Sequence, residues 1–222
     1  MQNTKILFDE EDRKLWTSID TWNTLSESIR KKTEISVLEL GCGSGRWMLD
    51  FCKCVPNTKK VHVTVSDINI NAVEYACELL HKSYNKRIKS INGIVSNMFN
   101  NIPKQKFDVI FFNPPQTPSL FTHYKSGGRL GTKYFYLFLD SVKPYLFIES
   151  LVLFMCIEFS KGSQFMAKHG TCIRLSSINR VYNSEYYDKL VPSWNCYIES
   201  IMSNLKRKPI YKQIIYKFIF DL

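Results

Sequence analysis

Two patterns of apolar positions alternate along the chain, one with apolar residues every three or four positions and one with continuous apolar runs. Apolar side chains that recur every three or four positions predict a helix over residues 9–32, and its acidic start suits a helix N-terminus. Continuous apolar runs predict buried strands. The expected strands are 35–40, 61–66, 91–95, 107–112 and 150–157, and further helices are expected at 46–54, 69–82 and 132–143.

The order of these elements predicts an α/β fold. Strands that alternate with helices form βαβ units, so we expect a mostly parallel sheet with helices on both faces. Residues 211–220 alternate loosely and predict a strand that closes the sheet at its edge, whereas residues 179–208 show no readable period. We expect residues 35–222 to form one domain and residues 1–34 to form a helical segment that could act as a lid.

The composition is that of a packed globular protein. Of the 222 residues, 45% are hydrophobic, and no linker or repeat divides them. The formal net charge of +10 suits a nucleic acid partner, but the lysines are scattered, so this partner is possible without being favoured. Seven cysteines without a second close pair predict reduced thiols and no metal site. Because we find no secretory or membrane-spanning run, we expect a cytoplasmic protein with no membrane contact.

A glycine-rich turn follows the first expected strand and is the first candidate binding site. It reads Gly41-Cys-Gly-Ser-Gly45 and is preceded by the acidic Glu39. Glycines allow a sharp turn here and let a ligand approach the backbone closely. The dinucleotide fingerprint G-x-G-x-x-G requires a small residue where this chain has Arg46, so an ordinary dinucleotide fold is disfavoured.

This turn resembles motif I of class I S-adenosylmethionine-dependent methyltransferases. The resemblance implies a Rossmann-like fold with a mostly parallel, seven-stranded sheet, and it implies S-adenosylmethionine as the cofactor. In that family the loop wraps the methionine part of the cofactor. The residues of this chain that match the loop are Glu39, Gly41, Cys42, Gly43 and Gly45.

Two further strand ends carry candidate cofactor residues. Asp67 ends the second expected strand, roughly 20 residues beyond the glycines, where a carboxylate can accept both hydroxyl protons of a ribose. Its neighbour Ile68 belongs to the same candidate site. The alternative is that Asp67 caps the helix that follows. At the third strand end, resemblance to the superfamily implies that Asn97 faces the adenine amino group and that Met98 packs on the ring.

The buried strand 107–112 ends in the sequence Asn113-Pro114-Pro115-Gln116. Prolines fix φ and remove backbone donors, so this turn is rigid and exposes acceptors. The Asn113 side-chain oxygen and the Pro114 carbonyl can each accept one hydrogen from an –NH2 group. Such a pairing orients the nitrogen lone pair and offsets the positive charge that grows during methyl transfer. A plain turn after a strand is the alternative.

This tetrapeptide resembles the Asn-Pro-Pro-aromatic motif of methyltransferases that act on planar nitrogens. Among these are adenine-N6 enzymes and the HemK-type enzymes, which methylate a glutamine amide in translation release factors. The loop Ser126-Gly-Gly-Arg-Leu-Gly131 is also similar to one in short HemK-like proteins. The chain departs from the family at Gln116, where an aromatic residue is usual, so we expect a smaller, more polar acceptor that Gln116 contacts by hydrogen bonds. Weaker candidates for acceptor contacts are Pro115, Phe121, His123 and Tyr124.

The resemblance also bears on partners. Long HemK proteins carry a helical release-factor-binding domain before the catalytic domain, and we expect it to be absent because only residues 1–34 precede the first strand. Short HemK relatives use a small zinc-binding activator subunit, so a partner of that kind is possible here.

We therefore expect an enzyme that transfers a methyl group from S-adenosylmethionine to an amide or amino nitrogen, with a protein glutamine as the first candidate acceptor. Asn113, Pro114 and Gln116 would form the reaction site. Three alternatives stay open. They are a small-molecule methyltransferase acting on an amino acid, amine or thioether, a nucleic-acid base methyltransferase, and a catalytically silent subunit that binds the cofactor.

Overall fold

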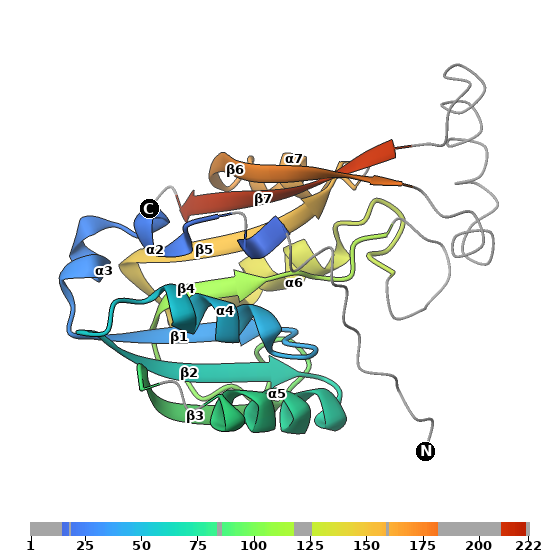
Figure 1. Ribbon diagram of the computed structural model, residues 1–222. Helices are drawn as coiled ribbons and strands as arrows, with labels where there is room; N and C mark the ends of the chain where they lie inside the picture. The colour runs from blue at the N-terminus through green and yellow to red at the C-terminus, as the bar shows by residue number, and fades with distance from the viewer. Residues whose placement is uncertain are drawn as a thin grey trace.

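Seven strands form one sheet within the residues that the computed structural model describes, which are 15–17, 19–83, 86–117, 126–158, 160–181 and 210–220 (Figure 1). The strand order is β3-β2-β1-β4-β5-β7-β6. Strands β1 to β5 are parallel, and β7 is antiparallel to both of its neighbours. The expected mostly parallel sheet is therefore confirmed. The strands are β1 Glu34–Leu40, β2 Lys60–Asp67, β3 Ile88–Val95, β4 Phe107–Phe112, β5 Leu146–Ile157, β6 Gly170–Val181 and β7 Ile210–Phe220.

Helices cover both faces of this sheet, as expected. One face buries side chains of α4 and α5 and of the segment before β1, and the other buries side chains of α6 and α7. Among the described residues, no helix is both long and apolar enough to cross a membrane. The helices are α2 Thr21–Thr24, α3 Glu27–Lys31, α4 Arg46–Cys54, α5 Ile70–Lys82, α6 Lys133–Val142 and α7 Gly162–Met166, and a 3-10 turn covers Lys143–Tyr145.

The continuous helix expected over residues 9–32 is wrong for the part that the structure describes. Residues 15–17 are helical, and α2 and α3 then form two separate short helices. The side chains of Asp20 and Ser26 each accept a backbone N–H three residues further on, so each begins a new helix. These caps compete with continuation of the first helix, which the apolar period alone does not reveal.

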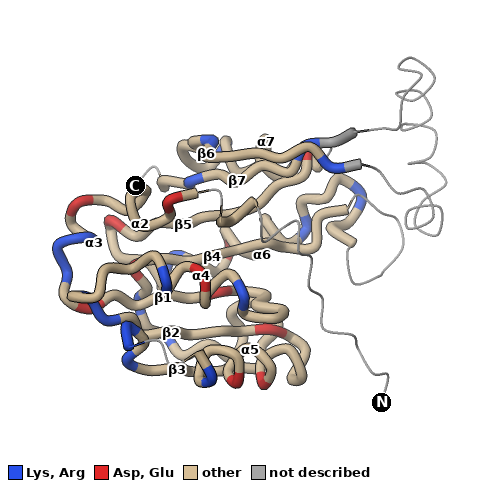
Figure 2. The backbone as a smooth tube through the Cα atoms, viewed as in Figure 1, with Lys and Arg blue, Asp and Glu red and all other residues tan. Residues whose placement is uncertain are grey.

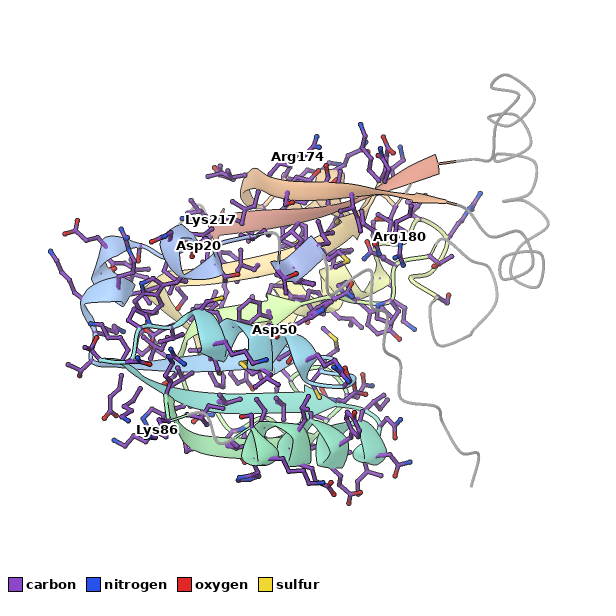
Figure 3. All side chains as sticks on the ribbon, in the orientation of Figure 1. Asp20, Asp50, Lys86, Arg174, Arg180 and Lys217 are labelled. Carbon is purple, nitrogen blue, oxygen red and sulfur yellow. The ribbon has the colours of Figure 1, made fainter. Side chains whose placement is uncertain are left out.

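The described part of this N-terminal segment is packed into the main core. The Trp16 ring lies 4.6 Å from that of Trp47 on α4 and 5.7 Å from that of Phe111 on β4, measured between centroids. At the other end of the segment, Lys217 of β7 donates a hydrogen bond to the Thr24 carbonyl oxygen at 3.0 Å (Figure 3). The segment therefore contacts both β4 and β7.

The C-terminal strand is not the edge strand that its pattern predicts. β7 lies between β5 and β6, and it pairs with both along most of its length. Its side chains Ile215 and Phe218 are fully buried, one on each face of the sheet. Neither β6 nor α7 was expected, and together they carry the chain past β5 so that β7 can return between the two strands.

Candidate functional site

The carboxyl ends of β1, β2, β3 and β4 lie along one edge of the sheet. Leu40 of β1 pairs with Ser66 of β2 on one side and with Phe112 of β4 on the other. Asp67 at the end of β2 pairs with Val95 at the end of β3. Neighbouring strands are about 5 Å apart, so the loops that leave these ends lie close together. The expected cofactor and reaction residues therefore meet at this edge.

The glycine-rich turn leaves β1 at this edge and folds back on β2. Its three glycines, Gly41, Gly43 and Gly45, all have positive φ angles of 73°, 50° and 67°. The backbone N–H groups of Gly41 and Cys42 both donate to the Ser66 carbonyl oxygen, at 2.7 and 2.9 Å. A side chain at position 41 would meet nothing within 4 Å, so this glycine leaves backbone open to a ligand rather than making room for a neighbouring residue.

Asp67 is aimed at this turn by two backbone hydrogen bonds. Its Oδ2 accepts from the Gly43 N–H and its Oδ1 from the Asn69 N–H, both at 3.0 Å. A carboxylate has about four acceptor positions, so acceptor capacity remains for a diol. The Asn69 side chain accepts from Asn71 N–H and is the N-cap of α5, so Asp67 is not needed for that role. Ile68 is 70% exposed beside it.

Glu39 is buried directly behind the glycine turn. Its side chain is only 2% exposed, and its Oε2 has no hydrogen-bond partner among the described residues. Burial raises the pKa of the Glu39 carboxyl well above its ordinary range, the nearby Asp67 carboxylate raises it further, and a hydrogen bond from the Met48 backbone acts in the opposite direction. Because the N-cap of α4, Gly45, has no side chain, Glu39 supplies an acceptor to the first turn of that helix from within the sheet.

Cys42 turns away from the exposed side of the loop into the core. It is 5% exposed, and burial together with the Glu39 and Asp67 carboxylates raises the pKa of its thiol. The side chain therefore stays a neutral thiol and packs as a small apolar group. Any contact it makes with a cofactor would come from its backbone.

The loop after β3 places Asn97 at the same edge and holds its neighbour in a strained conformation. Asn97 is exposed, whereas Met98 is partly buried against the core on the α6 face. Met98 has a φ of 52°, the one positive value among the described non-glycine residues. The Ser96 hydroxyl holds this turn by donating to the Met98 carbonyl at 2.8 Å and accepting from Asn101 N–H at 3.0 Å. Such strain concentrates at binding sites.

The Asn113–Gln116 turn leaves β4 beside the glycine turn. Asn113 and Pro115 are partly exposed, whereas Pro114 and Gln116 are buried. The Gln116 side chain is 6% exposed, and its Nε2 donates to Asn113 Oδ1 at 3.5 Å and to the Met155 carbonyl at 3.1 Å. This arrangement is at odds with the expectation that Gln116 contacts the acceptor, because the amide is already bonded inside the protein.

Three of the weaker acceptor candidates, Phe121, His123 and Tyr124, lie outside the described residues. Two serines that hold the candidate site were not anticipated. Ser96 fixes the turn at Met98, and the Ser160 hydroxyl donates to Gln116 Oε1 at 3.4 Å. Neither serine belongs to a recognisable motif, because each role depends on partners that the fold brings near.

Two hollows on the described surface lie away from this edge. They have volumes of about 390 and 350 Å³ and share the lining residues Lys106, Phe147, Ile148 and Glu149. These residues flank the beginnings of β4 and β5, at the opposite end of the strands from the glycine turn. None of the candidate site residues lines either hollow, so we do not assign the site to them.

A known protein family shares the part of the sequence that contains this edge. The profile of the family described as "Methyltransferase small domain" matches residues 17–130, which include the glycine turn, Asp67 and Asn113. A bifunctional methyltransferase of Rickettsia bellii is 40% identical over 81 residues, covering 36% of this chain and 14% of that protein. A malonyl-[acyl-carrier protein] O-methyltransferase of Ilyobacter polytropus is 37% identical over 82 residues, covering 37% of this chain and 28% of that protein.

The match thus spans less than a third of the length of either relative. Among solved structures, the fold is similar to that of precorrin-6y C5,15-methyltransferase from Geobacter metallireducens. The TM-score is 0.52 at 12% identity, and the alignment covers 99% of this chain and 93% of the other. This likeness confirms the expected Rossmann-like methyltransferase fold.

Proposed function

Because the chain belongs to the Methyltransferase small domain family and is an S-adenosylmethionine-dependent methyltransferase, we propose that it methylates an amide or amino nitrogen, with a protein glutamine as the acceptor. The HemK-like assignment is part of this proposal. The observation that carries it is the position of Asn113, whose side-chain oxygen is held at the end of β4, beside the glycine turn.

The residues at this edge fit S-adenosylmethionine. The unpartnered, buried Oε2 of Glu39 suits the positive charge that the cofactor carries, and the open backbone at Gly41 suits close approach of its methionine part. Asp67 would accept the ribose hydroxyls, and Asn97 would accept from the adenine amino group. When bound, the cofactor supplies an activated methyl group on a sulfonium.

The Asn-Pro-Pro turn supplies what an –NH2 acceptor needs. Asn113 Oδ1 and the Pro114 carbonyl each accept one of its hydrogens, which leaves the nitrogen lone pair free to point toward the cofactor edge. As methyl transfer makes the nitrogen positive, both oxygens stabilise the growing charge without reorganising. The chain's own contribution is therefore orientation and charge stabilisation. The methylated nitrogen then loses one proton to water, so a dedicated base is not required before transfer.

The first test is transfer of a labelled methyl group from S-adenosylmethionine into a cell extract divided by molecular size. The extract also supplies any partner subunit that the enzyme needs. We expect label in the protein fraction, and we expect Asn113→Ala to lower the initial rate at least about 100-fold. The affinity for S-adenosylhomocysteine should change less than about twofold in this variant. Asn92→Ala, which removes an exposed asparagine from β3, is the matched control.

The chemical stability of the label identifies the methylated atom. Strong acid releases methylamine from an N-methyl amide, mild base releases methanol from a methyl ester, and an N-methyl amine survives both treatments. Release as methylamine supports a glutamine amide. Base-labile label would overturn transfer to nitrogen, and label confined to small molecules would overturn the protein acceptor.

A further inference from the structure

The side chain of Gln116 takes the place of a missing strand residue. Its Oε1 accepts from the Ile157 backbone N–H at 2.8 Å, and its Nε2 donates to the Met155 carbonyl at 3.1 Å. In a parallel sheet, the peptide groups of a residue bond to the two residues that flank its neighbour on the next strand. The Gln116 amide bonds to Met155 and Ile157, which flank Cys156 on β5. It therefore continues the hydrogen-bond ladder between β4 and β5 beyond the end of β4.

The sheet needs this substitute because β4 ends before β5 does. The last pair between the two strands joins Phe112 to Phe154, whereas β5 continues to Ile157 and stays paired with β7 on its other side. Pro114 and Pro115 have no N–H to donate. Without Gln116, the buried polar groups at the end of β5 would lose partners, which is unfavourable for folding.

The same amide also reaches the proposed reaction residue. Its Nε2 donates to Asn113 Oδ1 at 3.5 Å, and the Ser160 hydroxyl donates to Gln116 Oε1 at 3.4 Å. At 3.5 Å the bond to Asn113 is weak, so its effect lies in orienting that side chain rather than in stability. Asn113 is thereby oriented by a group that is itself fixed to β5.

The backbone of Gln116 is fixed as well. A side chain at Gly131, which has a φ of 73°, would collide with the Gln116 carbonyl oxygen, so the loop that contains Gly131 packs directly on this residue. The Gly127 N–H donates to the Thr117 carbonyl at 2.9 Å and ties the other end of that loop to the next residue along the chain. With main chain and side chain both held, Gln116 has little freedom to turn toward an acceptor.

We propose that Gln116 is a positioning residue, which fixes the Asn113 oxygen toward the acceptor nitrogen and does not itself contact the acceptor. The inference rests on the proposed role of Asn113. It accounts for glutamine at a position where the resembling family has an aromatic residue. A planar amide can replace a peptide group in the ladder, and an aromatic ring cannot.

The test combines a double-mutant cycle with nuclear magnetic resonance. Gln116→Met keeps the size of the side chain and removes the amide, and Gln213→Met changes an equally buried glutamine on β7 as the matched control. We measure the initial rate of label transfer to extract protein, the affinity for S-adenosylhomocysteine and the thermal midpoint. The side-chain NH2 signals of Asn113 and Gln116 are followed in 15N-labelled protein.

We expect Gln116→Met to lower the rate about 10- to 100-fold while the S-adenosylhomocysteine affinity changes less than about twofold. In the Asn113→Ala background the same change should lower the residual rate less than about twofold, because the residue on which it acts is gone. The Asn113 NH2 signal should shift in Gln116→Met and stay unchanged in Gln213→Met.

An equal rate loss in both backgrounds, or an unchanged Asn113 signal, would overturn the positioning role. A normal rate in Asn113→Ala would instead overturn the proposed function. In that case the Asn113 NH2 signal of Gln116→Met would still show whether Gln116 orients Asn113. If Gln116→Met does not fold, Gln116→Glu replaces it. The protonated carboxyl keeps one donor and the ionised carboxyl has none. The rate relative to wild type should therefore fall as pH rises through the pKa of the introduced carboxyl, and a constant ratio overturns the proposal.

Discussion

Glu39 shows how a single buried residue can serve both the fold and a proposed cofactor site. Its carboxyl accepts a hydrogen bond from the first turn of α4, and its second oxygen has no partner among the described residues. A buried carboxyl group with one oxygen that makes no hydrogen bond destabilises the protein without ligand. It becomes favourable when a positive charge binds nearby. Stability and binding therefore make opposite demands on this residue.

The protonation of Glu39 should make stability depend on pH. Its pKa is raised on folding, so the folded protein keeps a proton that the unfolded chain loses above the ordinary value of 4.5. Stability of the ligand-free protein should therefore fall as pH rises from that value toward the raised pKa. Glu39→Gln should remove this contribution to the pH dependence of stability. The free energy of unfolding of the wild type relative to Glu39→Gln should therefore decrease as pH rises above 4.5.

Urea unfolding of both proteins over this pH range provides the measurement. Glu74→Gln, on α5, is the control for a change of charge alone. Parallel pH profiles for wild type and Glu39→Gln would contradict the raised pKa.

At the scale of the secondary-structure elements, the place of β7 between β5 and β6 decides how this end of the sheet is assembled. It is paired along both edges, and its position keeps β6 attached to the parallel part of the sheet. An edge strand would leave the N–H and C=O groups along one of its edges unpaired. In its observed position, β7 contributes to the core on both faces.

Two substitutions in β7 test this position. Phe218 is fully buried, and Phe218→Ala should lower the free energy of unfolding by about 3–5 kcal/mol because it leaves a cavity in the core. Ile219, the next residue, is 43% exposed, and Ile219→Ala should cost less than about 1 kcal/mol. Urea unfolding measures both changes. Similar small losses for both variants would contradict the contribution of β7 to the core.

At the scale of the whole molecule, much of the positive charge of the described residues lies away from the proposed site. Many Lys and Arg residues gather where α3 ends and where β2 and β3 begin (Figure 2). Several of them are paired with carboxylates, among them Lys31 with Glu27 at 2.7 Å and Lys89 with Glu34 at 2.6 Å. The edge proposed to bind the cofactor is at the other end of the parallel strands, and Glu39 and Asp67 lie there.

This charge distribution predicts a weak salt dependence of methyl transfer. A polyanionic acceptor held by six to ten phosphate contacts loses roughly 10³- to 10⁵-fold in affinity between about 50 and 200 mM salt. We expect the initial rate with a protein acceptor to change less than about tenfold over the same range. Rates measured at subsaturating extract concentration test this. A steep loss that nuclease treatment abolishes would support the nucleic-acid alternative.

The sequence alone was sufficient for several features whose signal was local. The expected bounds of the helix at 46–54 and of the strand at 107–112 agree with α4 and β4. The apolar residues of α4 recur so that one face of the helix is buried, and the continuous apolar run of β4 is buried on both faces of the sheet. The positive φ angles at Gly41, Gly43 and Gly45 follow from the residue type itself. The α/β architecture is a consequence of these local patterns repeated along the chain, whereas the cofactor class came from the resemblance of the glycine turn to a methyltransferase motif.

The tertiary structure decided every feature that depends on a distant partner. The place of β7 between β5 and β6 is set by which edges remain free after the other strands have paired, and its own pattern fits either place. The role of Gln116 is set by Met155 and Ile157, which lie 39 and 41 residues further along the chain. A glutamine after two prolines has the same local chemistry whether it points to a substrate or into the sheet. Only the strand that arrives beside it determines which groups its amide can bond.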